Sequence, residues 1–119
     1  MASDKVFVIK EGVTITDEVV AIIAGLAATE VDGVHSLGGD LTPDDIMRAG
    51  AGKLAKGVRI LRSEEGSILV RLAVNIGFGY EIPKVCTSIQ ERVKSSIENM
   101  TGINTREVDI KVASVALTE

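Results

Sequence analysis

Ten consecutive residues without a polar side chain, residues 19–28 (VVAIIAGLAA), constrain the fold of this chain more than any other segment. The segment is about half as long as a membrane-spanning helix needs to be, so it predicts a buried helix in a globular protein. Thr16 is a suitable N-cap because its hydroxyl can accept a free backbone N–H of the first turn, and the two acidic residues after it suit the positive end of the helix dipole. We expect this helix over residues 17–30, ended at Gly33.

A helix that is apolar on every side cannot show the polar outer stripe of an ordinary surface helix. Its larger side chains can face a sheet, which leaves a smooth strip of small residues that another backbone can approach closely. This strip consists of Ala21, Ala24, Gly25 and Ala28. Two compatible interpretations are open. Residues 34–56 or a second helix cover the strip within the chain, or the strip is an interface for a second copy or a partner, since large exposed apolar patches usually mark interaction sites.

The middle of the chain predicts two neighbouring strands, over residues 58–63 and 67–77, joined by a turn at Glu64, Glu65 and Gly66. In the second strand every second residue from 68 to 76 is apolar, so these residues share one face. Extended segments are also expected at residues 5–15, interrupted by Gly12, and in a final strand that alternates Val108, Ile110 and Val112 with charged residues.

A second long helix is predicted between Pro83 and Gly102, with Gly102 in the left-handed stop position. Its apolar stripe recurs at spacings of three and four residues. The stripe contains Ile82, Val85, Cys86, Ile89, Val93, Ile97 and Met100. A cap, a proline and two acids at residues 42–45 (TPDD) also predict a short helix, and small residues predict a flexible loop before Gly57.

These elements predict a single α+β domain over residues 1–119, built as a two-layer structure. Its antiparallel sheet is expected to have the two main helices packed on one face, and the other face should be polar and open to water. The sequence shows no internal repeat, linker or targeting segment.

Catalytic and metal-binding patterns are missing. One cysteine, Cys86, excludes a disulfide framework and a Cys-based zinc site, and one histidine, His35, offers no second imidazole ligand. Gly52 and Lys53 lack the earlier glycine and the following hydroxyl residue of a phosphate-binding loop. Carboxylates gather at helix starts and in a turn, where none is selectively desolvated. We therefore expect no catalytic residue, no metal and no cofactor.

A nucleic-acid-binding domain is the alternative function. Arg59, Arg62 and Arg71 can cluster on the hairpin, and Lys53 and Lys56 lie in the preceding loop. Two Phe, one Tyr and no Trp leave no aromatic platform for base stacking, and a net charge of −4 argues weakly against a nucleic-acid partner. The pattern favours a solvated face of mixed charge.

Four segments resemble the alkaline shock protein family, a group of small bacterial proteins tied to envelope and general stress responses. The segments are residues 12–34 (GVTITDEVVAIIAGLAATEVDGV), 56–58 (KGV), 82–85 (IPKV) and 98–112 (ENMTGINTREVDIKV). The resemblance covers residues 5–117 and rests on caps, packing positions and turns. It implies a cytoplasmic, non-enzymatic protein that self-associates, without established catalytic residues, and some members are recruited to the membrane by a membrane-anchored relative. The chain lacks the long charged tails of stress-type members and is similar to short, housekeeping-type members.

The sequence therefore favours a non-catalytic cytoplasmic scaffold or interaction protein, linked to cell-envelope homeostasis or the stress response. We expect a homo-oligomer that comes close to the membrane through a protein partner. Beside the small-residue strip, we expect a second interaction surface on the open face of the sheet, formed by Arg59, Arg71 and Lys111.

Overall fold

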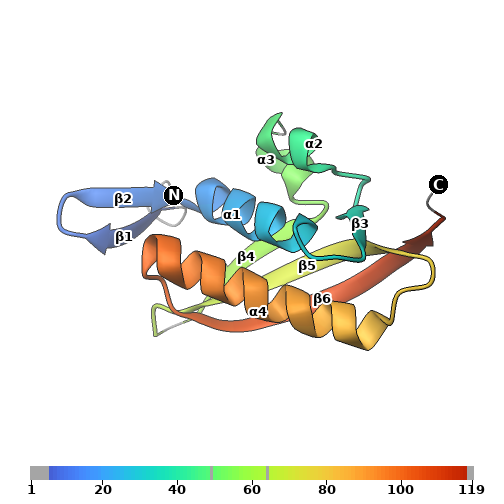
Figure 1. Cartoon of the computed structure of the whole chain (residues 1–119). Coiled ribbons are helices and arrows are strands. Elements are labelled where there is room, and N and C mark those ends of the chain that lie inside the picture. Colours follow the sequence, from blue (N-terminus) through green and yellow to red (C-terminus); the bar gives the residue numbers. More distant parts are fainter. Residues whose placement is uncertain (1–5, 49, 64, 118–119) are drawn as a thin grey trace.

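The computed structural model describes residues 6–48, 50–63 and 65–117 of the chain. The molecule is elongated, with extents of 47 × 26 × 20 Å. Along the chain lie β1 (Val6–Lys10), β2 (Val13–Thr16), α1 (Asp17–Thr29), β3 (Val34–Leu37), α2 (Pro43–Arg48), α3 (Ala51–Leu54), β4 (Val58–Arg62), β5 (Ile68–Gly77), α4 (Ile82–Thr101) and β6 (Thr105–Ala116). Helices α1 and α4 lie side by side on one face of the main sheet (Figure 1). The α+β class with two main helices on one face is confirmed.

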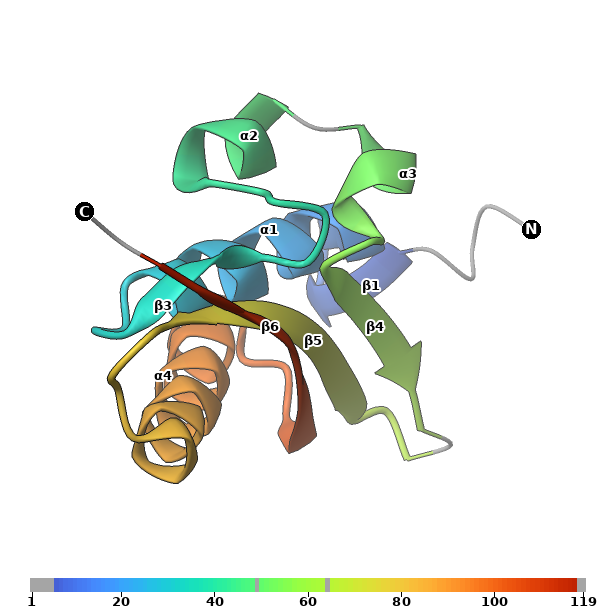
Figure 2. The same ribbon diagram turned by 90° about the vertical axis from the view of Figure 1, so that its right-hand side faces the viewer.

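Strand β5 is the centre of the main sheet. Strand β6 pairs with β5 over residues 68–77, and β4 and β3 pair with residues 68–72 and 74–76 of β5. Because β6 occupies one side of β5, β3 and β4 lie end to end along the other side (Figure 2). The prediction of an antiparallel sheet throughout is wrong for β6, which runs parallel to β5 because the 20-residue α4 carries the chain back along the sheet.

The helix-covered face of β5 is the core of the molecule. As predicted, every second side chain from Ile68 to Ile76 is buried there. The opposite face is polar at Arg71, but Asn75 on that face is also buried. The Asn75 amide donates to Ser36 Oγ at 2.9 Å and accepts from Ser114 Oγ at 2.8 Å, so it joins β3, β5 and β6. The open face therefore ends before Asn75, where the sequence predicted an open polar face along the whole sheet.

Helix α1 is covered on the side of its small residues, whereas Ile22, Ile23 and Leu26 are half-buried and Val19 is exposed. As predicted, Thr16 caps it, accepting the N–H of Val19 at 3.2 Å. A Cβ atom at Gly25 would lie 3.1–3.4 Å from side-chain atoms of residues in β3, α2 and β4, namely Leu37, Ile46 and Val58. All four residues of the predicted strip, Ala21, Ala24, Gly25 and Ala28, are buried. The segment after α1 thus covers the strip within the chain, as the first interpretation predicts, and a role of the strip in contacts with a second copy or a partner stays a prediction.

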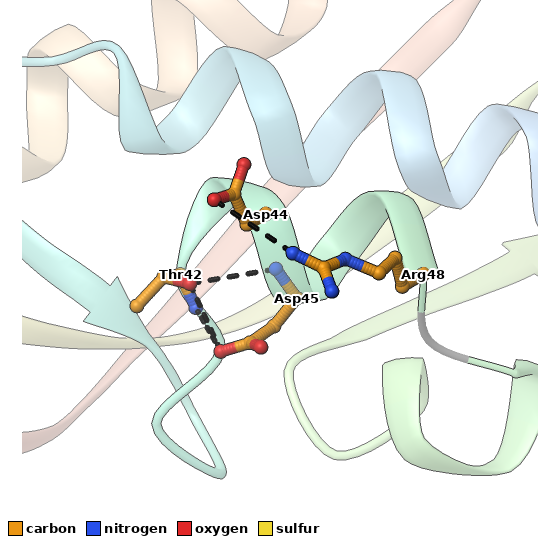
Figure 3. A network of polar contacts seen from close by, with 4 residues as sticks. All are labelled: Thr42, Asp44, Asp45 and Arg48. Carbon is orange, nitrogen blue, oxygen red and sulfur yellow. Dashed lines mark hydrogen bonds and ion pairs between the residues drawn. The ribbon is translucent and has the colours of Figure 1, made fainter.

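The two short helices each bury one aliphatic side chain above α1, Ile46 in α2 and Leu54 in α3 (Figure 2). Figure 3 shows the predicted start of α2, where Thr42 Oγ1 accepts the N–H of Asp45 at 3.4 Å and the Asp45 carboxylate accepts the N–H of Thr42 at 3.2 Å. That N–H, together with the Thr42 hydroxyl, lowers the pKa of Asp45. The flexible loop predicted before Gly57 contains α3 instead, because burial of Leu54 fixes this turn.

Helix α4 packs through the middle of its predicted stripe. Val85, Ile89, Val93 and Ile97 are buried, and Cys86 is half-buried. Ile82 and Met100, at the ends of the stripe, are exposed, and α4 extends beyond α1 at both ends (Figure 1). Gly102 takes the predicted left-handed conformation, with φ +77°. Among the helices of the described residues, none combines the length and the hydropathy needed to cross a bilayer.

Strands β1 and β2 form a separate hairpin that projects at one end of the molecule, with Gly12 in its turn at φ +80° (Figure 1). Arg62 of β4 attaches this hairpin to the body. Its guanidinium lies 3.8 Å from the ring centroid of Phe7, donates to the Val6 carbonyl at 2.7 Å and pairs with Asp17 at 3.1 Å. In the predicted turn between β4 and β5, Gly66 has φ +88°, and Glu64 lies outside the described residues.

Candidate interaction surface

Four basic side chains line a hollow of about 180 Å³ on the open face of the main sheet. Lys56 precedes β4, Arg59 belongs to β4, Arg71 to β5 and Lys111 to β6. Arg59 lies opposite Arg71 in the register of β4 and β5, and Lys111 is the partner of Ala73 in the register of β5 and β6. The structure thus brings together the three residues predicted as a second interaction surface, and it adds Lys56. We call these four residues and their surroundings the basic hollow.

Positive charge in the basic hollow is only partly compensated. Asp109 is the one carboxylate that lines it, and its Oδ2 lies 3.9 Å from Nε of Arg71. The other ion pairs among the described residues engage different cations, in the pairs Arg48–Asp44, Arg62–Asp17, Lys84–Glu81, Arg92–Glu30 and Lys94–Glu98. The hollow is therefore a region of excess positive charge in a chain whose net charge is −4.

Two carboxylates of β6 continue this face beside the hollow. Glu107 and Asp109 stand two residues apart on β6, opposite Leu69 and Arg71 of β5. Hydrogen bonding with the carboxyl group of Asp109 raises the pKa of Glu107, and repulsion between the two negative charges adds to the effect. Asp109 is thus shared between a cation and a second acid.

An apolar groove of about 600 Å³ lies on the other side of β4. Residues 58–61 of β4 form one wall, and the end of α3 contributes Leu54. The start of α1 contributes Asp17, Glu18 and Ala21, and the β1–β2 hairpin contributes Val6 and Thr16. The groove and the basic hollow share Ala55 and Arg59, so the two surfaces meet at β4. Sequence reasoning missed this groove, because its walls come from segments distant in the sequence, whose proximity no local pattern records.

The basic residues of the nucleic-acid alternative do not form one cluster. Lys56, Arg59 and Arg71 meet in the hollow, whereas the guanidinium of Arg62 is held by the β1–β2 hairpin and Asp17. Lys53 belongs to α3 and does not line the hollow. None of the three aromatic residues lines the hollow either: Phe7 packs under Arg62, and Phe78 and Tyr80 follow the end of β5.

The groups predicted to lack a catalytic role lie outside both surfaces. His35 is exposed on β3, with Nδ1 3.3 Å from Ser36 Oγ. Burial raises the pKa of the Cys86 thiol on α4, which disfavours the reactive thiolate. Within the part of the chain that the structure describes, no three His, Cys, Asp or Glu side chains are grouped as a metal site requires.

Similarity to known proteins covers most of the chain. The sequence model of the alkaline shock protein 23 family, described as having a cell envelope-related function, matches residues 8–117. Uncharacterized protein YqhY of Bacillus subtilis is 35% identical over 103 residues, which cover 87% of this chain and 76% of that protein. Uncharacterized protein Spy1535 of Streptococcus pyogenes serotype M6 is 33% identical over 103 residues, which cover 87% of this chain and 78% of that protein.

Among solved structures, the variant MamM CTD H264A-E289A-C267S matches with a TM-score of 0.48 and 16% identity, over 87% of this chain and 96% of that chain. This likeness is too distant to carry information on function. The family match extends over nearly the whole chain, and it confirms the resemblance to the alkaline shock proteins. The chain belongs to the alkaline shock protein 23 family, whose described function is related to the cell envelope.

Proposed function

We propose that this protein is a non-catalytic scaffold that binds other proteins, and further copies of itself, through the open face of its main sheet. The observation that carries the proposal is the basic hollow, where Lys56, Arg59, Arg71 and Lys111 face a single lining carboxylate, that of Asp109. An exposed cluster of one charge sign accelerates encounter with an oppositely charged surface and fixes its orientation. The preferred partner is therefore an acidic protein surface.

A second copy of the chain is one such partner. The chain has 17 acidic and 13 basic residues, so its excess negative charge lies outside the hollow. Glu30, Asp32 and Glu91 line a separate hollow between the end of α1 and helix α4, together with one cation, Arg92, which pairs with Glu30. Contact between two different patches is heterologous, and it extends into a chain of subunits unless the rotation closes a ring. This geometry supports self-association.

Membership in a family described as cell envelope-related supports a place of action beside the membrane. In this proposal the protein works in the cytoplasm, and a membrane-anchored protein partner holds it near the envelope. The binding chemistry is the same for both kinds of partner, because an acidic surface on either one complements the basic hollow.

Light scattering over a wide range of concentration tests the proposal. We expect the mass of the wild-type chain to rise with concentration and to fall with added salt, since exposed charges are screened. The double variant Arg71→Glu, Lys111→Glu should remain a monomer. The variant Lys84→Glu makes the same kind of charge reversal at the start of α4, outside the hollow, and should assemble like the wild type. A wild-type chain that is monomeric at every concentration contradicts self-association.

The nucleic-acid alternative is separated by a second measurement on the same variants. A mixed-sequence oligonucleotide should show no mobility shift with the wild-type chain at low salt, because the hollow offers no aromatic side chain for stacking. A shift that the double variant loses and that weakens steeply with salt would assign the hollow to nucleic acid instead.

A further inference from the structure

We infer that the outer edge of β4 is a docking site for an extended segment of a partner protein in which acidic and apolar residues alternate. The segment adds to the main sheet as a further strand, with its acidic side chains toward the basic hollow and its apolar side chains in the groove. The inference rests on the proposed function, for which it specifies the chemistry of the partner.

The backbone of β4 is available for such a strand. The Gly57 carbonyl accepts the N–H of Ala73 at 2.9 Å, so residues at every second position from Gly57 onward face β5 in this antiparallel ladder. The intervening residues Val58 and Ile60 point their N–H and C=O groups away from β5. In the described part of the chain, no strand pairs with this side of β4 (Figure 2). These free groups are what an added strand binds.

One face of the edge accepts apolar side chains. The groove of about 600 Å³ is lined there by Ala21 of α1, Leu54 of α3, and Val58 and Ile60 of β4. Asp17 and Glu18, at the start of α1, also line the groove. Ile60 is only half-buried, whereas Val58 is buried, so apolar surface of β4 remains open to the groove at Ile60. Valine- or leucine-sized side chains of an added strand would bury this surface, which is the main source of favourable free energy in docking.

The opposite face of the same edge accepts acidic side chains. Arg59 points to that face between Val58 and Ile60, because successive side chains of a strand alternate. The hollow places Lys56 and Arg71 beside it. A docked strand therefore meets apolar surface and positive charge at alternate residues, which selects a partner segment of alternating apolar and acidic residues.

Strand β6 shows that this sheet already holds a strand of that composition. On the other side of β5, Glu107 and Asp109 lie on the open face, and Asp109 pairs with Arg71 at 3.9 Å. Val108 and Ile110, which alternate with these two acids along β6, belong to the helix-covered face, where Val108 is buried. A segment docked on β4 would repeat this arrangement, with Arg59 in the place of Arg71.

The first test uses the full chain and a synthetic capped peptide in which glutamate and valine alternate over the length of β4. Titration followed by fluorescence anisotropy should give saturable binding. Two control peptides should bind at least about tenfold more weakly: one with alternating lysine and valine, and one with glutamates and valines in separate blocks. In the complex, hydrogen exchange of the Ile60 amide should slow, because the peptide accepts this N–H.

A pair of variants at Ile60 separates the backbone from the side chain. Ile60→Pro removes the outward N–H and leaves the ladder to β5 intact, whereas Ile60→Ala keeps the N–H and loses similar packing. We expect the proline variant to bind the alternating peptide about fivefold more weakly than the alanine variant. Circular dichroism checks that both are folded. Arg59→Glu should weaken binding about tenfold, and Lys84→Glu should leave it unchanged.

Equal binding of all three peptides, equal affinity of the two Ile60 variants, or unchanged exchange of the Ile60 amide would each overturn the docking site. If assembly still depends on Arg71 and Lys111 in light scattering, the proposed function survives that failure. If the alternating peptide binds normally while the chain remains a monomer, the docking site stands, and the self-association part of the proposed function fails.

Discussion

The outer edges of β6 and β4, on opposite sides of the main sheet, differ in how their main-chain groups are covered. Along β6, side chains of α4 occupy main-chain acceptors: Gln90 Nε2 donates to the Val108 carbonyl at 3.0 Å, and Lys94 Nζ donates to the Thr105 carbonyl at 3.2 Å. Among the described residues, no side chain donates to the main chain of β4. An apolar groove lies beside β4 instead. Helix α4 thus covers the start of the β6 edge, between Thr105 and Val108, and leaves the β4 edge available.

This difference indicates at which edge a strand of another chain can be added to the sheet. Open edges invite unwanted pairing, and proteins protect them with charges, short strands or covering elements. Strand β4 is short, with five residues, and it carries Arg59 and Arg62, yet Arg62 is turned toward the β1–β2 hairpin. The remaining charge, Arg59, repels a second basic edge but attracts an acidic one. The β4 edge is therefore selective, whereas the start of the β6 edge is protected by α4.

The largest expected effect comes from breaking the packing that supports β4. A large side chain at Gly25 of α1 would displace its neighbours, because the Cβ position already lies 3.4 Å from Cγ2 of Val58 and 3.1 Å from Cδ1 of Leu37. Gly25→Leu should lower the free energy of unfolding by about 3 kcal/mol, measured by urea denaturation. Gly52→Leu on α3, where a Cβ meets nothing within 4 Å, is the matched control and should not destabilise. Unchanged stability with altered assembly would show that the small-residue strip is an interface after all.

A smaller effect is expected from opening the closed edge. Gln90→Leu removes the donor to the Val108 carbonyl and should cost about 1 kcal/mol in the free energy of unfolding. It should also make the chain associate at high concentration, as measured by light scattering, because the β6 edge is then less protected. Asn99→Leu places the same leucine on an exposed residue near the end of α4, outside the hollows and the groove described above, and serves as the control. No difference between the two variants would mean that α4 does not protect the edge.

Most of the fold followed from local patterns. Caps at Thr16 and Thr42, the alternation of β5 and the left-handed Gly102 are fixed by neighbouring residues, and the structure confirms all of them. The parallel pairing of β6 and the covering of Gly25 depend instead on where distant segments meet. A period of 2 or 3.6 residues identifies the buried face of an element but not the element that buries it.

The candidate site also has a part that local patterns predict and a part that depends on distant segments. Arg59 and Arg71 could be placed on one face from strand alternation and hairpin pairing, and Lys111 from alternation in the last strand. The groove could not be predicted, since it exists only because β4 is an edge strand beside Leu54 and Ala21. An edge is a property of strand order, which a single sequence records weakly.

Amide hydrogen exchange in the wild-type chain tests directly whether the β4 edge is open. In the ladder to β5, Leu61 is opposite Leu69, and its N–H points toward β5. The N–H of Ile60 points away from β5. The Leu61 amide should therefore exchange at least about tenfold more slowly than the Ile60 amide in the free chain, by NMR. Equal rates would mean that the β4 edge is covered in solution.

The smallest effect concerns the acids that β6 already carries on the open face. Asp109, through hydrogen bonding and charge repulsion, raises the pKa of Glu107, so Glu107 binds its proton at a higher pH in the folded chain than in the unfolded chain. Protonation of Glu107 therefore adds to the free energy of unfolding. This contribution is complete below the pKa of Glu107 in the unfolded chain, and it is lost as the pH rises through the pKa in the folded chain. A carbon NMR titration should show this upward shift of the Glu107 pKa, and Asp109→Asn should remove most of it.

The same titration compares the two edges. A glutamate of the alternating peptide docked beside Arg59 has a cation where Glu107 has an acid, so its pKa should move down on binding. Its affinity should accordingly fall as the pH drops through its titration, while protonation of Glu107 adds net positive charge to the open face. A peptide glutamate whose pKa rises on binding would place it beside Glu107 and Asp109, at the β6 edge, and would reverse the assignment of which edge is open.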